Sequence, residues 1–148
     1  MKLYSAHQIS GLSYEAVKAY YDWIAYELGD YFTVLCPMTA KGALRTEVEF
    51  KAHGYGTPIS SNHAIIERDH WMVAQADVLL VDLSGMTQVS IGCMMELAWG
   101  YHLNKHTVVV MEQDNPQRHA FVLEAADIVF EHTEDAVDYL KKLSSGAW

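Results

Sequence analysis

Short apolar segments alternate with longer amphipathic segments along the chain, which is typical of an α/β domain with a mainly parallel sheet. The apolar segments predict five strands, at residues 2–6, 32–36, 76–83, 107–111 and 128–130. The amphipathic segments predict helices at residues 14–28, 62–75, 90–103, 118–125 and 134–143, with Asn62 capping the second. We therefore expect a single α/β domain over residues 1–148, with a flavodoxin-like or Rossmann-like sheet covered by helices on both faces.

The order of these elements also predicts where a ligand binds. In open parallel sheets, ligands bind at the carboxyl ends of the strands, near a switch in strand order. We therefore expect a site just after Ala6, just after Leu83 and at the start of the helix near Ser90. Residues 38–62 form the least regular segment, with one helix expected at 44–52, and such segments are more often functional than inert.

The composition is that of a small globular protein. The 148 residues are 51% hydrophobic and 20% charged, which argues against disorder. The longest apolar runs are far shorter than the ~20 residues of a membrane span, and no extended apolar stretch follows Lys2, as a secretory signal requires. We expect a cytoplasmic protein that does not bind membranes.

The net charge and the absence of certain motifs exclude several classes of ligand. The net charge of −9 disfavours a nucleic-acid polymer as partner, because an acidic surface repels phosphates. Cys36 and Cys93 are too few for a zinc site, and a predicted helix stop separates His102 from His106, so no metal is expected. The chain has no G-x-G-x-x-G motif and no P-loop, so we expect no cofactor.

Two carboxylates lie on predicted apolar faces. Asp69 shares a helical stripe with Ile65 and Met72, where a carboxylate needs an ionic partner, a cap or a solvated cleft; Arg68 is expected to point away into solvent. Glu96 is the only charged residue between Asp82 and Lys105. It is flanked at four residues on either side by Gly92 and Gly100, which indicates close approach of another group. A Glu96 that simply faces water is the alternative.

Ser90 begins the helix that carries Glu96. A serine there caps the helix, and a helix N-terminus also binds phosphate groups. Carboxylates on two helices that both face the strand ends suit acid–base or nucleophilic chemistry on a sugar.

The ordered set of these segments resembles the nucleoside 2-deoxyribosyltransferase superfamily, which includes 2′-deoxynucleoside 5′-monophosphate N-hydrolases and CMP-type N-glycosidases. The matching segments are residues 2–6 with 9–11, 66–69, 76–82, and 90–100 with 104–105. The resemblance implies that Glu96 attacks the anomeric carbon of the sugar, that Asp69 assists departure of the base, and that Tyr4 orients Glu96.

The resemblance also implies the remaining contacts of a small nucleotide or nucleoside. The substrate-binding residues would be Ser90, Gly92 and the loop of His7, Gln8, Ile9, Ser10 and Gly11. It implies a homodimer or higher homo-oligomer with shared active sites, in which Asn115 or His119 of a neighbouring subunit completes the pocket.

Ser90 decides between branches of the superfamily. The nucleoside transferases usually carry an aspartate at this place, whereas the nucleotide hydrolases carry a serine, which can donate to a 5′-phosphate. The hydrolases also have an arginine in the first loop, which this chain lacks, so His7, Arg45 or the neighbour's His119 would supply the charge. We therefore expect N-glycosidic cleavage of a nucleoside 5′-monophosphate, resolved by water. The alternatives are a transferase that exchanges nucleobases, a catalytically silent nucleotide sensor, and an unrelated partner-binding module.

Overall fold

The computed structural model describes residues 1–42, 50–51 and 55–147. Within these residues one sheet has the strand order β2-β1-β3-β4-β5, and every neighbouring pair of strands is parallel. The strands are β1 (Lys2–His7), β2 (Thr33–Leu35), β3 (Val78–Asp82), β4 (His106–Val110) and β5 (Ile128–Phe130). The α/β class is confirmed, and the order is the flavodoxin-like one. The helix expected at 44–52 and Arg45 lie outside the described residues.

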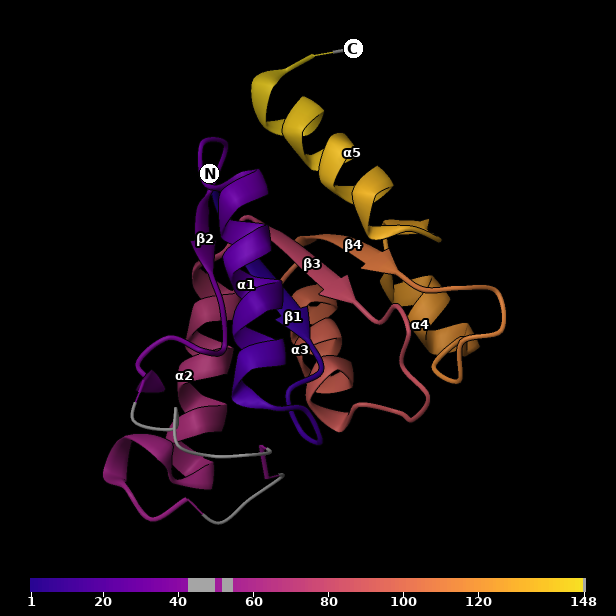
Figure 1. Cartoon of the computed structure of the whole chain (residues 1–148). Coiled ribbons are helices and arrows are strands. Elements are labelled where there is room, and N and C mark those ends of the chain that lie inside the picture. The colour runs from indigo at the N-terminus through magenta and orange to yellow at the C-terminus, as the bar shows by residue number, and fades with distance from the viewer. Residues whose placement is uncertain (43–49, 52–54, 148) are drawn as a thin grey trace.

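Helices cover both faces of this sheet (Figure 1). They are α1 (Tyr14–Leu28), α2 (Asn62–Gln75), α3 (Ile91–His102), α4 (Ala120–Ala125) and α5 (Thr133–Ser145), with a short 3-10 helix η2 (Pro58–Ser60) before α2. Successive residues of a strand point to opposite faces. Leu3 of β1 therefore packs with α1 and α5, whereas Tyr4 packs with α2, α3 and α4. Apolar side chains of β3 and β4 alternate in the same way, which gives one core on each face.

Most predicted boundaries agree with the structure to within two residues, and α1, α2 and β5 agree fully. The cap of α2 was predicted wrongly. Ser61 has extended backbone and its hydroxyl accepts a hydrogen bond from the Ala64 N–H at 3.2 Å, so Asn62 is the first helical residue. Helix α4 begins at Ala120 rather than residue 118, because the preceding residues form a turn and His119 caps the helix.

The strand order reverses between β1 and β3, the two central neighbours. The chain leaves β1 through α1 on one face and leaves β3 through α3 on the other face. His7 and Asp82 are paired in register at the carboxyl ends of these strands, and the His7 Nδ1 donates to the Asp82 carbonyl at 2.9 Å. The two connections diverge here, which leaves room for a ligand.

The carboxylate of Asp82 holds this edge of the sheet together. It accepts hydrogen bonds from the Ser84 hydroxyl at 2.6 Å, the Thr133 hydroxyl at 3.0 Å and the Tyr20 hydroxyl at 3.1 Å. Since Tyr20 lies on α1 and Thr133 begins α5, the end of β3 is tied to both helices of one face. Among the described residues, no helix has the length and apolarity needed to cross a membrane.

Candidate active site

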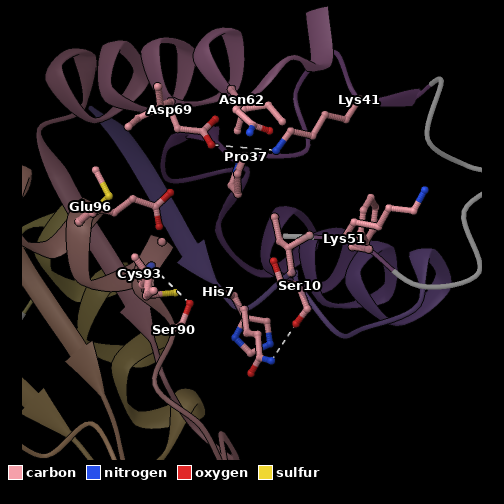
Figure 2. A pocket seen from close by; sticks show the side chains of 18 of the residues that line it. His7, Ser10, Pro37, Lys41, Lys51, Asn62, Asp69, Ser90, Cys93 and Glu96 are labelled. Carbon is pink, nitrogen blue, oxygen red and sulfur yellow. Dashed lines mark hydrogen bonds and ion pairs between the residues drawn. The ribbon is translucent and has the colours of Figure 1, made fainter. Parts of the chain in front are cut away.

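A cavity of about 510 Å³ opens at the carboxyl ends of β1 and β3, where the strand order predicted it. It is lined by residues at the end of β1 and in the loop after it, by residues after β2, and by residues of α2 and of α3 with the segment just before α3. Eight of the predicted site residues line it: His7, Gln8, Ile9, Ser10, Asp69, Ser90, Gly92 and Glu96. Figure 2 shows the carboxyl groups of Asp69 and Glu96 both directed into this space.

Glu96 is a buried charged group of the cavity, with 7% of its surface exposed. The hydroxyl of Tyr4, which is fully buried on β1, donates a hydrogen bond to Glu96 Oε1 at 2.5 Å. Burial raises the pKa of Glu96 to about 8; the Tyr4 hydrogen bond and Lys41 oppose this rise, and Asp69 adds to it. Glu96 therefore does not face open water, and Tyr4 lies behind it rather than in the cavity lining.

The two glycines that flank Glu96 on α3, Gly92 and Gly100, lie in different surroundings. A Cβ on Gly100 would lie 2.4 Å from Leu79 Cδ2, so this end of α3 lies directly against β3. A Cβ on Gly92 would meet no atom within 4 Å, because this residue borders the cavity. The predicted close approach is confirmed at Gly100, where the neighbour is a strand, but not at Gly92, where the space is open.

Asp69 is buried on α2 between two cations. Its Oδ2 lies 4.0 Å from Lys41 Nζ and its Oδ1 lies 3.9 Å from Arg68 Nε. Burial raises the pKa of Asp69 to about 6, and Lys41 and Arg68 oppose the rise. Oδ1 accepts no hydrogen bond from any described residue. The expectation that Arg68 is solvated was wrong, since its Nη1 donates to the Ile59 carbonyl at 2.9 Å and its side chain packs beside Asp69.

Lys41 was missed by the sequence analysis. It follows β2 through two successive turns, in which the Thr39 N–H donates to Cys36 and the Lys41 N–H to Met38, both at 3.0 Å. Ala40 has a φ of 62°, in the left-handed region. These turns direct the Lys41 side chain back to Asp69 (Figure 2). The available signal was its place after the second predicted strand, whose carboxyl end lies beside that of the first.

Ser90 caps α3, as its position predicted. Its hydroxyl accepts from the Cys93 N–H at 3.4 Å, and its own N–H donates to Gln117 Oε1 at 3.0 Å. Gln117 is in turn held by Asn115, whose Oδ1 accepts from the Gln117 N–H at 3.0 Å. The side chains of Gln117 and Asn115, both buried, therefore hold the backbone at the N-terminus of α3 in place. Ser90 also lines the cavity.

Four predicted residues do not line the cavity of their own chain: Tyr4, Gly11, Asn115 and His119. Gly11 has a φ of 84° and its N–H donates to the Phe50 carbonyl at 3.0 Å, so it shapes the loop. Asn115 is buried, and its amide donates to the Leu83 carbonyl at 2.8 Å and to Glu112 at 2.9 Å within its own chain. His119 is exposed at the cap of α4, beside Phe121.

The described residues contain no group of three histidine, cysteine or acidic side chains placed to hold a metal ion. The site is instead an acidic pair, Asp69 and Glu96, with a buried phenol and two cations beside it. Different surroundings have moved the two carboxyl pKa values to about 6 and about 8. Between these values the pair holds one proton, which lies mainly on Glu96 because it has the higher pKa, so ionised Glu96 with protonated Asp69 is the minor form of the pair.

Comparison with known proteins shows a shared fold. No protein-family model and no curated protein sequence matches the chain. Among solved structures, a conserved protein from Enterococcus faecalis V583 matches with a TM-score of 0.70 at 14% identity, over 97% of this chain and 98% of that one. A 2-deoxyribosyltransferase from Bacillus psychrosaccharolyticus matches with a TM-score of 0.66 at 20% identity, over 94% and 92%. The CMP N-glycosidase of Clostridium botulinum matches with a TM-score of 0.59 at 10% identity, over 97% and 99%.

Proposed function

We propose that this protein is a member of the nucleoside 2-deoxyribosyltransferase superfamily that hydrolyses the N-glycosidic bond of a (2′-deoxy)nucleoside 5′-monophosphate. The observation that carries the proposal is Glu96, a buried carboxylate held by the Tyr4 hydroxyl and directed into the cavity beside Asp69. The fold shared with a 2-deoxyribosyltransferase and a CMP N-glycosidase supports it.

The chemistry takes place in two steps. The first step starts from the minor form of the pair, in which the shared proton lies on Asp69 and Glu96 is ionised. An oxygen of Glu96 then forms a bond to C1′ of the sugar while the C1′–N bond breaks and its electron pair leaves with the base, which Asp69 protonates. In the second, water attacks C1′, the ester bond to Glu96 breaks, and the proton of the water returns to the acidic pair. Tyr4 donates to Glu96 throughout, so it holds one oxygen while the other is free to attack.

The 5′-phosphate is assigned to the N-terminus of α3. No hydrogen bond joins the N–H groups of Ile91 and Gly92 to another described residue, and the Ser90 hydroxyl lies at the same end. Backbone N–H groups and the helix dipole favour an anion at this place. A carboxylate at residue 90 would repel it, so the serine favours a nucleotide over a nucleoside.

Shared active sites in a homodimer or higher homo-oligomer form part of the proposal. Exposed apolar side chains lie along the outer side of α3: Ile91 (75% exposed) and Met95 (37%) are one turn apart, and Tyr101 (64%) lies near the C-terminal end of the helix. Ile91 and Met95 also line the cavity, so a second copy on this side of α3 would cover its mouth. Light scattering should show an oligomer, and Tyr101→Glu, which lies outside the cavity, should shift it to monomer. A wild-type monomer at all concentrations tested would contradict this part.

The test is release of free base from a panel of 5′-monophosphates and nucleosides, with and without an added acceptor base. We expect release from 5′-monophosphates that needs no acceptor, and a glycosyl adduct on Glu96 in the mass spectrum of acid-quenched enzyme. Glu96→Gln should abolish both, whereas Glu67→Gln, an exposed glutamate of α2, should retain them. Full turnover by Glu96→Gln would overturn the mechanism.

The same panel distinguishes the hydrolase from a transferase and from a silent sensor. A transferase would release base only when an acceptor is present, and would form the exchanged nucleoside. A silent sensor would bind a nucleotide and release no base during long incubation.

A further inference from the structure

Lys41 is a buried cation for which the two-carboxylate mechanism has no use. Only 5% of the residue is exposed, and it lines the cavity together with Asp69 and Glu96. Lysine is seldom buried unless its ammonium is paired, so such a position needs a reason.

The pairing of Lys41 within the chain is incomplete. Its Nζ lies 4.0 Å from Asp69 Oδ2, which is an ion pair but is longer than a hydrogen bond. An ammonium group has three hydrogens to donate. Within the described part of the chain, none of them has an acceptor at hydrogen-bond distance. A buried donor that is directed into a cavity and lacks an acceptor is suited to an acceptor on a ligand.

The position of Lys41 indicates which part of the ligand it meets. Figure 2 shows Lys41 beside Asp69 and away from Ser90, with Glu96 between Asp69 and Ser90. If the phosphate lies at Ser90 and the anomeric carbon lies at Glu96, the base lies at the end of Asp69 and Lys41. The ammonium therefore faces the base and not the phosphate.

We propose that Lys41 donates a hydrogen bond to the carbonyl oxygen next to the glycosidic nitrogen of the leaving base, so that the preferred substrate is a pyrimidine nucleotide. This inference rests on the function proposed above. Pyrimidine bases such as cytosine, uracil and thymine have a 2-carbonyl beside N1. Purine bases have no carbonyl beside N9, so they would leave the ammonium without this acceptor.

The contact strengthens as the bond breaks. When Glu96 forms its bond to C1′, the electron pair of the C1′–N1 bond moves to N1 and is shared with O2 through the N1–C2–O2 system. Negative charge thus develops on O2, where a preplaced cation in a buried site stabilises it most. The base then takes one proton, from Asp69 or from water, and leaves neutral. Lys41 gives up no proton and is unchanged at the end.

The test compares leaving groups in Lys41→Met and in wild type, each at the pH of its highest activity. Lys41→Met removes the ammonium that would stabilise the charge on O2, and loss of one donor of this kind is expected to lower kcat for dUMP by about 10²–10³-fold. Fluorine at C5 makes uracil a better leaving group, so it needs less help from a cation. The ratio of kcat for 5-fluoro-dUMP to kcat for dUMP should therefore be larger in Lys41→Met than in wild type. Lys41→Arg, which retains a cationic donor, should lie between the two.

Lys142→Met, on the exposed side of α5, serves as the matched control and should behave as wild type. Circular dichroism should show that each variant is folded, and Lys41→Arg tests the proposal even if Lys41→Met does not fold. If Lys41 only pairs with Asp69, both substrates should slow equally and the ratio should stay unchanged, which overturns the inference. A wild type that cleaves purine nucleotides better than pyrimidine nucleotides also overturns it and leaves the glycosidase function standing. Release of no base from any substrate would instead overturn the proposed function itself.

Discussion

The hydroxyl of Tyr4 donates a hydrogen bond of 2.5 Å to the carboxylate of Glu96, although the two residues are 92 positions apart in the chain. Tyr4 lies on the central strand β1, and Glu96 lies on the helix that covers the same face. A hydrogen-bond donor favours the ionised form of a carboxyl group, whereas burial favours the protonated form. The hydrogen bond and the burial therefore set the balance between ionised and protonated Glu96.

This balance predicts the pH dependence of activity. Below about pH 6 both Asp69 and Glu96 are protonated, so no nucleophile is present; above about pH 8 both are ionised, so no acid is present. We expect a bell-shaped profile of kcat/KM between these limits, measured on the best nucleotide of the panel.

Tyr4→Phe should change that profile in a defined direction. Without the phenol the ionised form of Glu96 loses its donor, so the pKa of Glu96 rises further and the alkaline limb moves to higher pH. A rise of one pKa unit makes the reactive form about tenfold rarer, so the maximum should fall by at least about tenfold. Tyr26→Phe, at an exposed tyrosine of α1, is the control. An unchanged profile in Tyr4→Phe would show that the phenol does not act through Glu96.

Glu96→Gln should stabilise the protein at alkaline pH. The pKa of Glu96 is raised from 4.5 to about 8 by folding, so the folded state holds more protons than the unfolded state in this interval. The contribution of Glu96 to the free energy of unfolding therefore falls as pH rises from about 4.5 to 8. Each pH unit is worth about 1.4 kcal/mol, so the variant should gain on the order of 3 kcal/mol over wild type between pH 5 and pH 8. Urea denaturation at the two pH values measures this gain, and a difference independent of pH would contradict it.

Gly92→Ala and Gly100→Ala should separate activity from stability on one helix. At Gly100 the added Cβ meets Leu79, which is fully buried and has little space to move. We expect a loss of about 1–3 kcal/mol, reduced by the better helix propensity of alanine. At Gly92 the Cβ enters open space at the cavity, so stability should be kept or improved while KM rises. Thermal denaturation and KM of both variants check this; a destabilised Gly92→Ala would argue against open space there.

Ser90→Asp should change the preference from nucleotide to nucleoside. Aspartate is as good a helix cap as serine, so α3 should be retained. Its charge would repel a 5′-phosphate at the same helix end. We expect the ratio of kcat/KM for the 5′-monophosphate to that for the nucleoside to fall by at least about tenfold. Ser90→Asn, a neutral cap, is the control; an equal fall in Ser90→Asn would place the phosphate elsewhere.

The sheet could be predicted from the sequence because its strands are buried on both faces. Such strands are continuous apolar runs, as in Val78–Asp82, and the helices between them have clear amphipathic spacing. Glu96 and Asp69 could be found as well, because each interrupts an apolar face. The cap of α2 was misplaced because neighbouring Ser61 and Asn62 are both good caps, and only the backbone conformation of Ser61 decides between them.

The surroundings of Lys41 and Arg68 were not predicted from the sequence because they depend on contacts between separate segments of the chain. Lys41 has no local pattern, since its burial comes from turns that direct it towards a helix about thirty positions later. Arg68 was expected in solvent because helical spacing places it off the apolar stripe. The Arg68 guanidinium instead donates a hydrogen bond to the Ile59 carbonyl, just before α2, and its side chain is therefore largely buried. Contacts of this kind depend on segments without regular periodicity.

The left-handed backbone of Ala40 has a consequence for how the ligand meets the site. An alanine in this conformation costs roughly 1–2 kcal/mol, which glycine would avoid. Glycine would also loosen the turn and allow the following ammonium to sample many directions. With alanine the cation is already in position before a ligand arrives, so binding need not immobilise it. If Lys41 meets the base as proposed, the strained turn at Ala40 lowers the entropic cost of that contact at some expense of folding stability.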